Sequence, residues 1–271
     1  MTTLITRADD LGSGPGANAA IGQAAGRGFI KNISCMAAGP LIEQGADCVR
    51  EFRSCCFGLH AVLNSEWDRV KWRPCGDARR IRSLLTPSGE FPASLKWFEG
   101  NAPALEEILY EFDCQLDRLI RLGLPVSYVD LHMMPDRVIP GLRGELSAWA
   151  ARKGLIDHSG YYRTPEQFEP AVALTLQQGR ENWAAWLDML ADGQYFCAMH
   201  PAQYSPESLL MGNAEIPAEY VARYRDVEFQ LLSTGVLESL CLERGITPVR
   251  YDQAARGRTE GLSDALRNEV R

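Results

Sequence analysis

The sequence lacks several features that assign a chain to a common class at once. No apolar run approaches the roughly 20 residues that a membrane-spanning helix needs, and the start MTTLITRADD has no basic segment followed by an apolar one. No G-x-x-x-x-G-K-[ST] phosphate loop and no C-x-x-C pair occur. We therefore expect a cytoplasmic protein with no membrane partner, no thiolate metal site and no redox motif.

Positive charge is also scarce. The 271 residues carry 28 Lys and Arg against 35 Asp and Glu, a net charge of −7, which argues against a nucleic-acid partner. The eight cysteines are scattered through apolar stretches, with only Cys55 and Cys56 adjacent. They are typical of buried, reduced thiols.

Strand-like and helix-like segments alternate along the chain, which predicts a parallel sheet. About seven segments favour a closed or nearly closed α/β barrel of parallel strands, although a doubly wound open sheet is an alternative. The strand-like segments are LITRADDLG, FIKNISCMAAGP, CCFGLHAV, PVSYVDLHMM, GLIDHSG, QYFCAMHPAQY and GITPVRYD.

We expect one domain over residues 1–253, followed by a polar tail at 254–271. The region from about 65 to 101 breaks the alternation and is rich in Trp, Pro, Gly and Arg. Long irregular insertions are often lids or binding loops. Its aromatic side chains either form a small satellite core or stack on sugar faces: Trp67, Trp72, Trp97 and Phe98.

Two adjacent acids, Asp9 and Asp10, end the first strand. Successive side chains of a strand point to opposite faces, so two neighbours can serve one centre only if the strand twists or bulges there. One acid could then bind a cation while the other accepts a proton. Helix capping is the alternative role.

Only four histidines occur, and three of them end strands: His60, His132 and His200. Because the carboxyl ends of parallel strands form one rim, these side chains should meet Asp9 and Asp10 there. A carboxylate and two imidazoles can hold a divalent cation and leave positions open. With a free Asp as base and a further His as acid, the set suits hydrolysis of an amide or ester.

Two nearby residues have less defined roles. His158 lacks the apolar lead-in of the other histidines, and we expect it to be structural or peripheral. Asp130 shares a strand face with His132, so it either orients that imidazole or faces the barrel core.

Four motifs, taken together, resemble the YdjC-like carbohydrate deacetylases, which include chitooligosaccharide deacetylase. RADDLG resembles the family's NADDFG, and GLHAVLN resembles GLHxxLT. VDLHMM, followed by Pro140, resembles DSHxHxHxxP, and AMHPAQY resembles the family's CHP segment. The likeness runs from the first strand to GITPVRYD.

The resemblance implies a distorted TIM-like barrel and a metal-dependent hydrolase that removes an acetyl group from an N-acetylated sugar or short oligosaccharide. It implies a divalent cation, Mg²⁺ or Zn²⁺, with a metal-bound water as nucleophile. The implied site consists of the metal ligands Asp10, His60 and His132, the general base Asp9, the acid or stabiliser His200, and Pro201 in the turn that presents it.

The chain departs from the family pattern at several positions. Arg7 replaces Asn beside the acid pair, Leu11 replaces Phe, and Met133 and Met134 stand where further histidines are usual. We place Arg7 among the substrate-binding residues, together with Trp72 and Trp97. A catalytically silent sugar-binding relative and another metal hydrolase remain alternatives. A homodimer is one option for the oligomeric state.

Overall fold

The computed structural model describes residues 1–161 and 170–257. Seven parallel strands form one sheet in the order β5-β4-β3-β2-β1-β6, with β7 paired to β1. Their bounds are β1 Thr2–Leu11, β2 Asn32–Cys35, β3 Cys56–Ala61, β4 Val126–Leu131, β5 Ile156–Asp157, β6 Gln194–Met199 and β7 Ile246–Val249.

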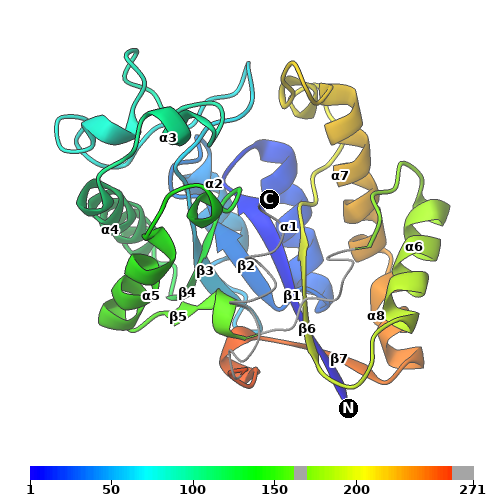
Figure 1. Ribbon diagram of the computed structural model, residues 1–271. Coiled ribbons are helices and arrows are strands. Elements are labelled where there is room, and N and C mark those ends of the chain that lie inside the picture. The colour runs from blue at the N-terminus through cyan, green and yellow to red at the C-terminus, as the bar shows by residue number, and fades with distance from the viewer. Residues whose placement is uncertain (162–169, 258–271) are drawn as a thin grey trace, which may run out of the picture.

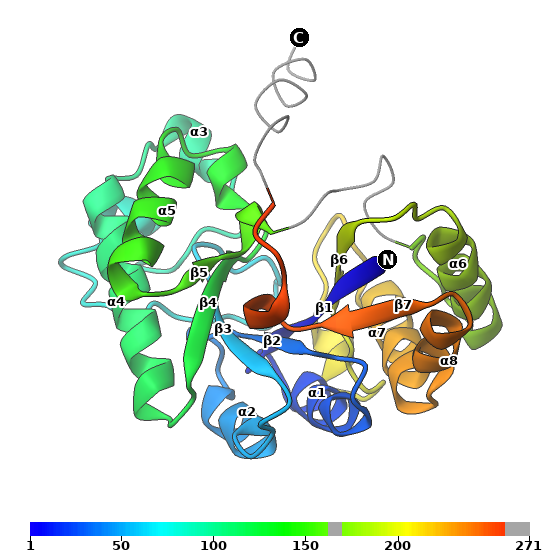
Figure 2. The same cartoon turned by 90° about the horizontal axis from the view of Figure 1, so that it is seen from below.

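The sheet curls into a half-barrel, and the predicted distorted TIM-like barrel is confirmed (Figure 2). β1 is central because β6 pairs with one of its edges, while β7 and β2 share the other. Asn32 lies at the junction of β7 and β2, where its side-chain amide donates to the carbonyls of Thr6 and Val249. Figure 2 shows β7 and the turn after it crossing below the other strands.

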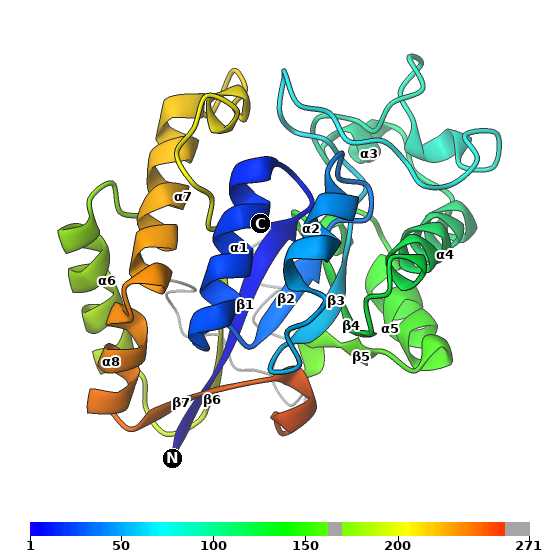
Figure 3. The same cartoon turned by 180° about the vertical axis from the view of Figure 1, so that it is seen from behind.

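Helices cover the outer face of the sheet (Figures 1 and 3). In α4, buried Ile108, Phe112 and Leu119 recur at the three- or four-residue spacing of a core-facing stripe. The helices are α1 Pro15–Arg27, α2 Ile42–Val49, α3 Trp97–Gly100, α4 Leu105–Arg121, α5 Leu142–Lys153, α6 Leu176–Asp188, α7 Ala218–Ser233 and α8 Val236–Glu243. Short 3₁₀ turns are η1 Arg82–Leu84, η2 Pro135–Arg137, η3 His158–Gly160, η4 Ser208–Leu210 and η5 Tyr251–Gln253.

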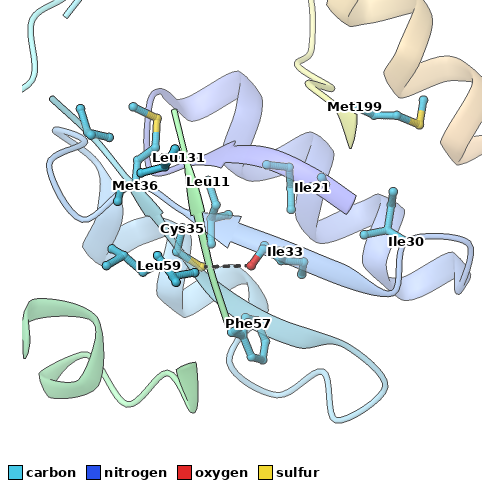
Figure 4. Close-up of a cluster of buried hydrophobic side chains, with 14 of the residues drawn as sticks. Leu11, Ile21, Ile30, Ile33, Cys35, Met36, Phe57, Leu59, Leu131 and Met199 are labelled. Carbon is cyan, nitrogen blue, oxygen red and sulfur yellow. Dashed lines mark hydrogen bonds between the residues drawn. The ribbon is translucent and has the colours of Figure 1, made fainter. Parts of the chain in front are cut away.

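Two hydrophobic groups lie on opposite faces of the sheet, as strand alternation requires. The outer group packs against the helices and includes Leu11, Ile33 and Leu59 (Figure 4). The inner group fills the lower part of the half-barrel and consists of Ile5, Cys56, Tyr128, Phe196, Ala198 and Tyr251. Higher up, the inward positions become polar, which places the charged groups near the carboxyl ends of the strands.

The insertion at 65–101 lies above the carboxyl ends of the strands on the β3 side (Figure 1). It contains only η1 and α3 as regular elements. Trp67, Trp72 and Phe98 are buried and join the outer core, while Trp97 is partly buried against it. The insertion is therefore packed onto the barrel rather than projecting from it.

Several other predictions concern the whole chain. All eight cysteines are free thiols and five of them are buried. Within the described ranges, no helix combines the length and apolar character needed to cross a membrane. The single domain at 1–253 and the tail at 254–271 stay predictions, and residues 258–271 of that tail lie outside the described residues.

Gly58 of β3 tests the packing of the barrel interior. A Cβ atom at this position would lie 2.1 Å from the ring of Tyr128. Tyr128 is buried, and its hydroxyl is hydrogen-bonded to Ser34 Oγ at 2.9 Å. We expect Gly58→Ala to lower the free energy of unfolding by about 3 kcal/mol, because the ring has no room to move. Urea denaturation measures this loss.

Gly144 in α5 provides the control, since a Cβ there meets nothing within 4 Å. Gly144→Ala should stabilise the protein by about 0.5 kcal/mol through helix propensity. Equal effects of the two substitutions would show that the contact with Tyr128 is unimportant.

Candidate metal centre

Asp10 departs from the alternation of β1. Arg7 and Asp9 point inward, so Asp10 should point outward, but its φ of 68° and an irregularity in the register between Ala8 and Leu11 turn it toward the same centre. A left-handed non-glycine residue costs free energy and is frequent at functional sites. The predicted distortion at the end of the strand is confirmed.

The turned carboxylate faces two imidazoles. Asp10 Oδ1 lies 3.5 Å from His60 Nε2 and 3.6 Å from His132 Nδ1, and the two nitrogens are 3.1 Å apart. Atoms bound to one divalent cation at about 2.0–2.2 Å are about 3.0–3.6 Å from one another. Asp10 Oδ1 is also buried without a hydrogen-bond partner among the described residues. The set that we call the triad therefore fits a divalent cation.

Each imidazole of the triad has a carboxylate at its other nitrogen. His60 Nδ1 lies 2.9 Å from Asp130 Oδ2, and His132 Nε2 lies 3.1 Å from Glu66 Oε2. Such carboxylates fix the orientation of metal-binding histidines. The suggestion that Asp130 orients His132 is wrong, because the partner of Asp130 is His60. Asp130 does face the barrel interior, and Glu66 was not anticipated.

Arg225 of α7 binds the second oxygen of Asp10. Its Nη2 lies 2.9 Å from Asp10 Oδ2, and the side chain is buried. The guanidinium holds the carboxylate by Oδ2 and leaves Oδ1 facing the imidazoles. Burial alone would raise the pKa of Asp10, but Arg225 together with the nearby histidines outweighs it, and the pKa falls well below its usual range.

Arg7 lies between two acids below the triad. Its Nε and Nη2 donate to the two oxygens of Asp9 at 2.6 and 2.7 Å, and Nη2 also lies 2.9 Å from Asp130 Oδ2. The guanidinium carbon is 4.6 Å from the centre of the Phe196 ring, and Nη1 is 3.3 Å from Tyr251 Oη. Asp9, His60 and Asp130 form a second acid–histidine group. Its positive charge is already supplied by the guanidinium of Arg7.

His200 follows β6 and reaches the same centre. Its Nε2 lies 3.9 Å from Asp9 Oδ2, and its backbone amide donates to Glu228 Oε2 at 2.7 Å. With 32% of its side chain exposed, His200 is far more accessible than the triad. Burial, followed by the charges of nearby Arg225 and His60, lowers its pKa against the opposing effect of two acids.

Of the other predicted residues, Trp72 and Arg7 contact this centre. The ring of buried Trp72 meets that of His132 edge-on at 5.9 Å. Trp97 lies in the insertion, and Arg7 is enclosed below Asp9, so the structure gives Arg7 no open surface. Met133 and Met134 are exposed, with φ of 57° and 54°. The substrate-binding roles of Arg7, Trp72 and Trp97 stay predictions.

His158 lies outside the triad, in η3. Burial, together with the Arg7 cation, lowers its pKa to about 4, although Asp130 and Asp157 act in the opposite direction. It is therefore a neutral neighbour of the Arg7 network at neutral pH.

Comparison with known proteins identifies the family of this chain. A family model described as "YdjC-like protein" matches residues 3–243. The chain belongs to the YdjC-like family. The resemblance inferred from the four motifs is thereby confirmed.

Relatives of this YdjC-like chain are named as deacetylases. A carbohydrate deacetylase of Geobacillus stearothermophilus is 30% identical over 257 residues, covering 91% of this chain and 96% of that protein. A chitooligosaccharide deacetylase of Enterobacter sp. (strain 638) is 30% identical over 181 residues, 65% of this chain and 64% of that protein.

A solved structure shares the fold of the YdjC-like chain. It is described as a putative cellobiose-phosphate cleavage protein from Enterococcus faecalis V583, and the TM-score is 0.76 at 20% identity. The match covers 93% of this chain and 98% of the other.

Protons compete with a cation for the triad of this YdjC-like chain. Burial alone would lower the pKa of His60, but Asp130, Asp9 and Asp10 outweigh it and raise the pKa to about 10. Burial is likewise outweighed at His132, where Glu66 and Asp10 raise the pKa to about 9. Only one proton fits between ring nitrogens 3.1 Å apart. A cation bound by the triad would therefore displace at least one proton.

We expect the affinity for Zn²⁺ to rise about tenfold per pH unit for each displaced proton between pH 6 and 8.5. Calorimetric titrations at several pH values, in buffers of different ionisation enthalpy, measure both the affinity and the protons released. A pH-independent affinity without proton release would contradict this expectation.

Proposed function

We propose that this chain is a metal-dependent hydrolase that removes an acetyl group from an N-acetylated sugar or short oligosaccharide. The observation that carries the proposal is the triad, in which Asp10 Oδ1 faces His60 and His132 and has no hydrogen-bond partner among the described residues. The names of the relatives supply the reaction and the class of substrate. The proposed cofactor is Mg²⁺ or Zn²⁺, with Asp10, His60 and His132 as ligands.

The residues beside the triad fit the proton transfers of amide hydrolysis. A bound divalent cation would supply Lewis acidity toward water and the acyl carbonyl. In the proposed reaction Asp9 accepts a proton as the water oxygen bonds to the carbonyl carbon. The C–N bond then breaks, acetate is released, and the departing nitrogen gains a proton.

His200 is the proposed donor of that proton. Its lowered pKa leaves the imidazole neutral at neutral pH, so it must first receive the proton taken by Asp9. The 3.9 Å between His200 Nε2 and Asp9 Oδ2 suits such a relay after a small movement. His200 is also the most accessible of these side chains, as a group facing the substrate should be.

In the proposal, the insertion at 65–101 helps to hold the sugar at the rim of the barrel. Trp97 is the better candidate of the two tryptophans for a sugar contact, because Trp72 is enclosed against His132. Arg7 would act on the substrate indirectly, by fixing the Asp9 carboxylate. The proposed location of the protein is the cytoplasm.

One observation favours a second function, that of a catalytically silent sugar-binding relative. Arg7 occupies both oxygens of Asp9 and could suppress its activity as a base. An acetate-release assay of the metal-loaded wild type on a panel of N-acetylated sugars separates the two functions. Sugar binding without acetate release would favour the silent relative, while release of phosphate from phosphoesters would indicate another hydrolase.

Substitutions of the two adjacent acids should have different effects. Asp10→Ala should abolish both metal binding and acetate release, because it removes a ligand. Asp9→Asn should keep the metal affinity within a few-fold but lower the turnover rate by about 10²–10⁴-fold, the usual contribution of a general base. Elemental analysis and acetate release measure the two effects. Full activity of metal-free Asp10→Ala would refute the mechanism.

A further inference from the structure

Glu66 links the insertion to the triad. It is the second residue of the insertion, its side chain is 8% exposed, and its two carboxylate oxygens lie 3.1 and 3.2 Å from His132 Nε2. This nitrogen is on the far side of the ring from Nδ1, which faces Asp10. Glu66 therefore contacts the edge of the His132 ring that points away from Asp10.

The backbone around Glu66 is firmly held. Asn64 Nδ2 donates to Glu66 Oε2 at 3.2 Å, and Asn213 Nδ2 donates to the Glu66 carbonyl at 3.2 Å. The amide of Asp68 donates to the Gly212 carbonyl at 2.9 Å. Asn64 thus fixes the carboxylate, and the segment that follows η4 fixes the backbone on either side of it.

The indole of Trp72 completes this support. Its Nε1 donates to the Asn64 carbonyl at 2.6 Å, and its ring packs edge-on against His132. The first residues of the insertion therefore limit both the tilt of the imidazole and the position of the carboxylate behind it.

The two imidazoles of the triad present different nitrogens. His60 presents Nε2 to the centre of the triad, and its Nδ1 contacts Asp130. His132 presents Nδ1, and its Nε2 contacts Glu66. A neutral imidazole carries its proton on only one nitrogen. A carboxylate acceptor at Nε2 favours the tautomer whose Nδ1 lone pair is free for a cation. Asp130 cannot do this for His132, because it is engaged with His60 and Arg7.

We propose that Glu66 is the positioning residue of His132: it fixes the tautomer and the orientation in which Nδ1 completes the metal site. The inference rests on the proposed function only in requiring that the triad binds a cation. It gives the insertion a second role besides packing, since part of the metal centre is assembled from it.

The test compares Zn²⁺ titrations of the wild type, Glu66→Gln and Glu66→Ala at one pH. Glu66→Ala should weaken the affinity about 10–100-fold, as is typical when a carboxylate behind a metal-binding histidine is removed. Glu66→Gln should weaken it less, because the amide oxygen still accepts from Nε2. Unchanged affinity in Glu66→Ala would overturn the inference.

Glu111→Gln is the matched control. Glu111 is a fully buried glutamate of α4 that accepts from the backbone amides of Cys75 and Gly76 at 2.8 and 2.7 Å. It fastens the same insertion, but the contacts of its carboxylate are with Cys75, Gly76 and Gln115. This variant should retain wild-type affinity. An equal loss in Glu111→Gln would assign the effect to packing of the insertion and overturn the role of Glu66.

A spectroscopic measurement covers the case in which Glu66→Ala fails to fold. With only four histidines, ¹⁵N-histidine labelling gives a simple spectrum of the Zn²⁺-loaded protein. The wild type should show a slowly exchanging proton on His132 Nε2, and Glu66→Gln should exchange it at least several-fold faster. Equal exchange rates would overturn the inference. A wild type that binds no Zn²⁺ would instead refute the proposed function.

Discussion

The structure around the triad depends on the neutralisation of four buried carboxylates: Asp9, Asp10, Glu66 and Asp130. Burying unpaired charges is costly, so each must have a partner. Arg7 and Arg225 supply two positive charges, which leaves two negative charges in the cluster. A divalent cation bound by the triad would balance them. Without one, protonation of the triad imidazoles is favoured, in agreement with their raised pKa values.

The two arginines perform complementary tasks. Arg225 binds one oxygen of Asp10 and leaves the other for the triad, while Arg7 ties Asp9 to Asp130. Asp130 in turn holds His60. The acid proposed as the base and the residue that orients His60, a proposed metal ligand, are thus joined through one guanidinium. The apolar layer below, with Phe196 and Tyr251, encloses this cation and strengthens its contacts.

Much of this arrangement follows from local sequence patterns. The alternation of strands and helices predicted the parallel sheet. The polar residues that end strands predicted where the site lies, at the carboxyl ends of those strands. The neighbouring acids even required the distortion found at Asp10. The sequence did not show which side chains lie opposite one another on neighbouring strands. Asp130 was matched to His132, two residues along the same strand, but the register of β3 and β4 sets it directly opposite His60. Adjacent strands are about 4.8 Å apart, closer than residues i and i+2 of one strand.

Glu66 and Arg225 were missed for a related reason. Glu66 lies in an aperiodic insertion and Arg225 on a helix more than 200 residues from Asp10, so neither carries a local signal. Crystals soaked with Zn²⁺ and measured at its absorption edge would show whether the triad binds a cation. We expect one anomalous peak within about 2.2 Å of Asp10 Oδ1, His60 Nε2 and His132 Nδ1. A peak elsewhere, with these three atoms left without metal, would contradict this expectation.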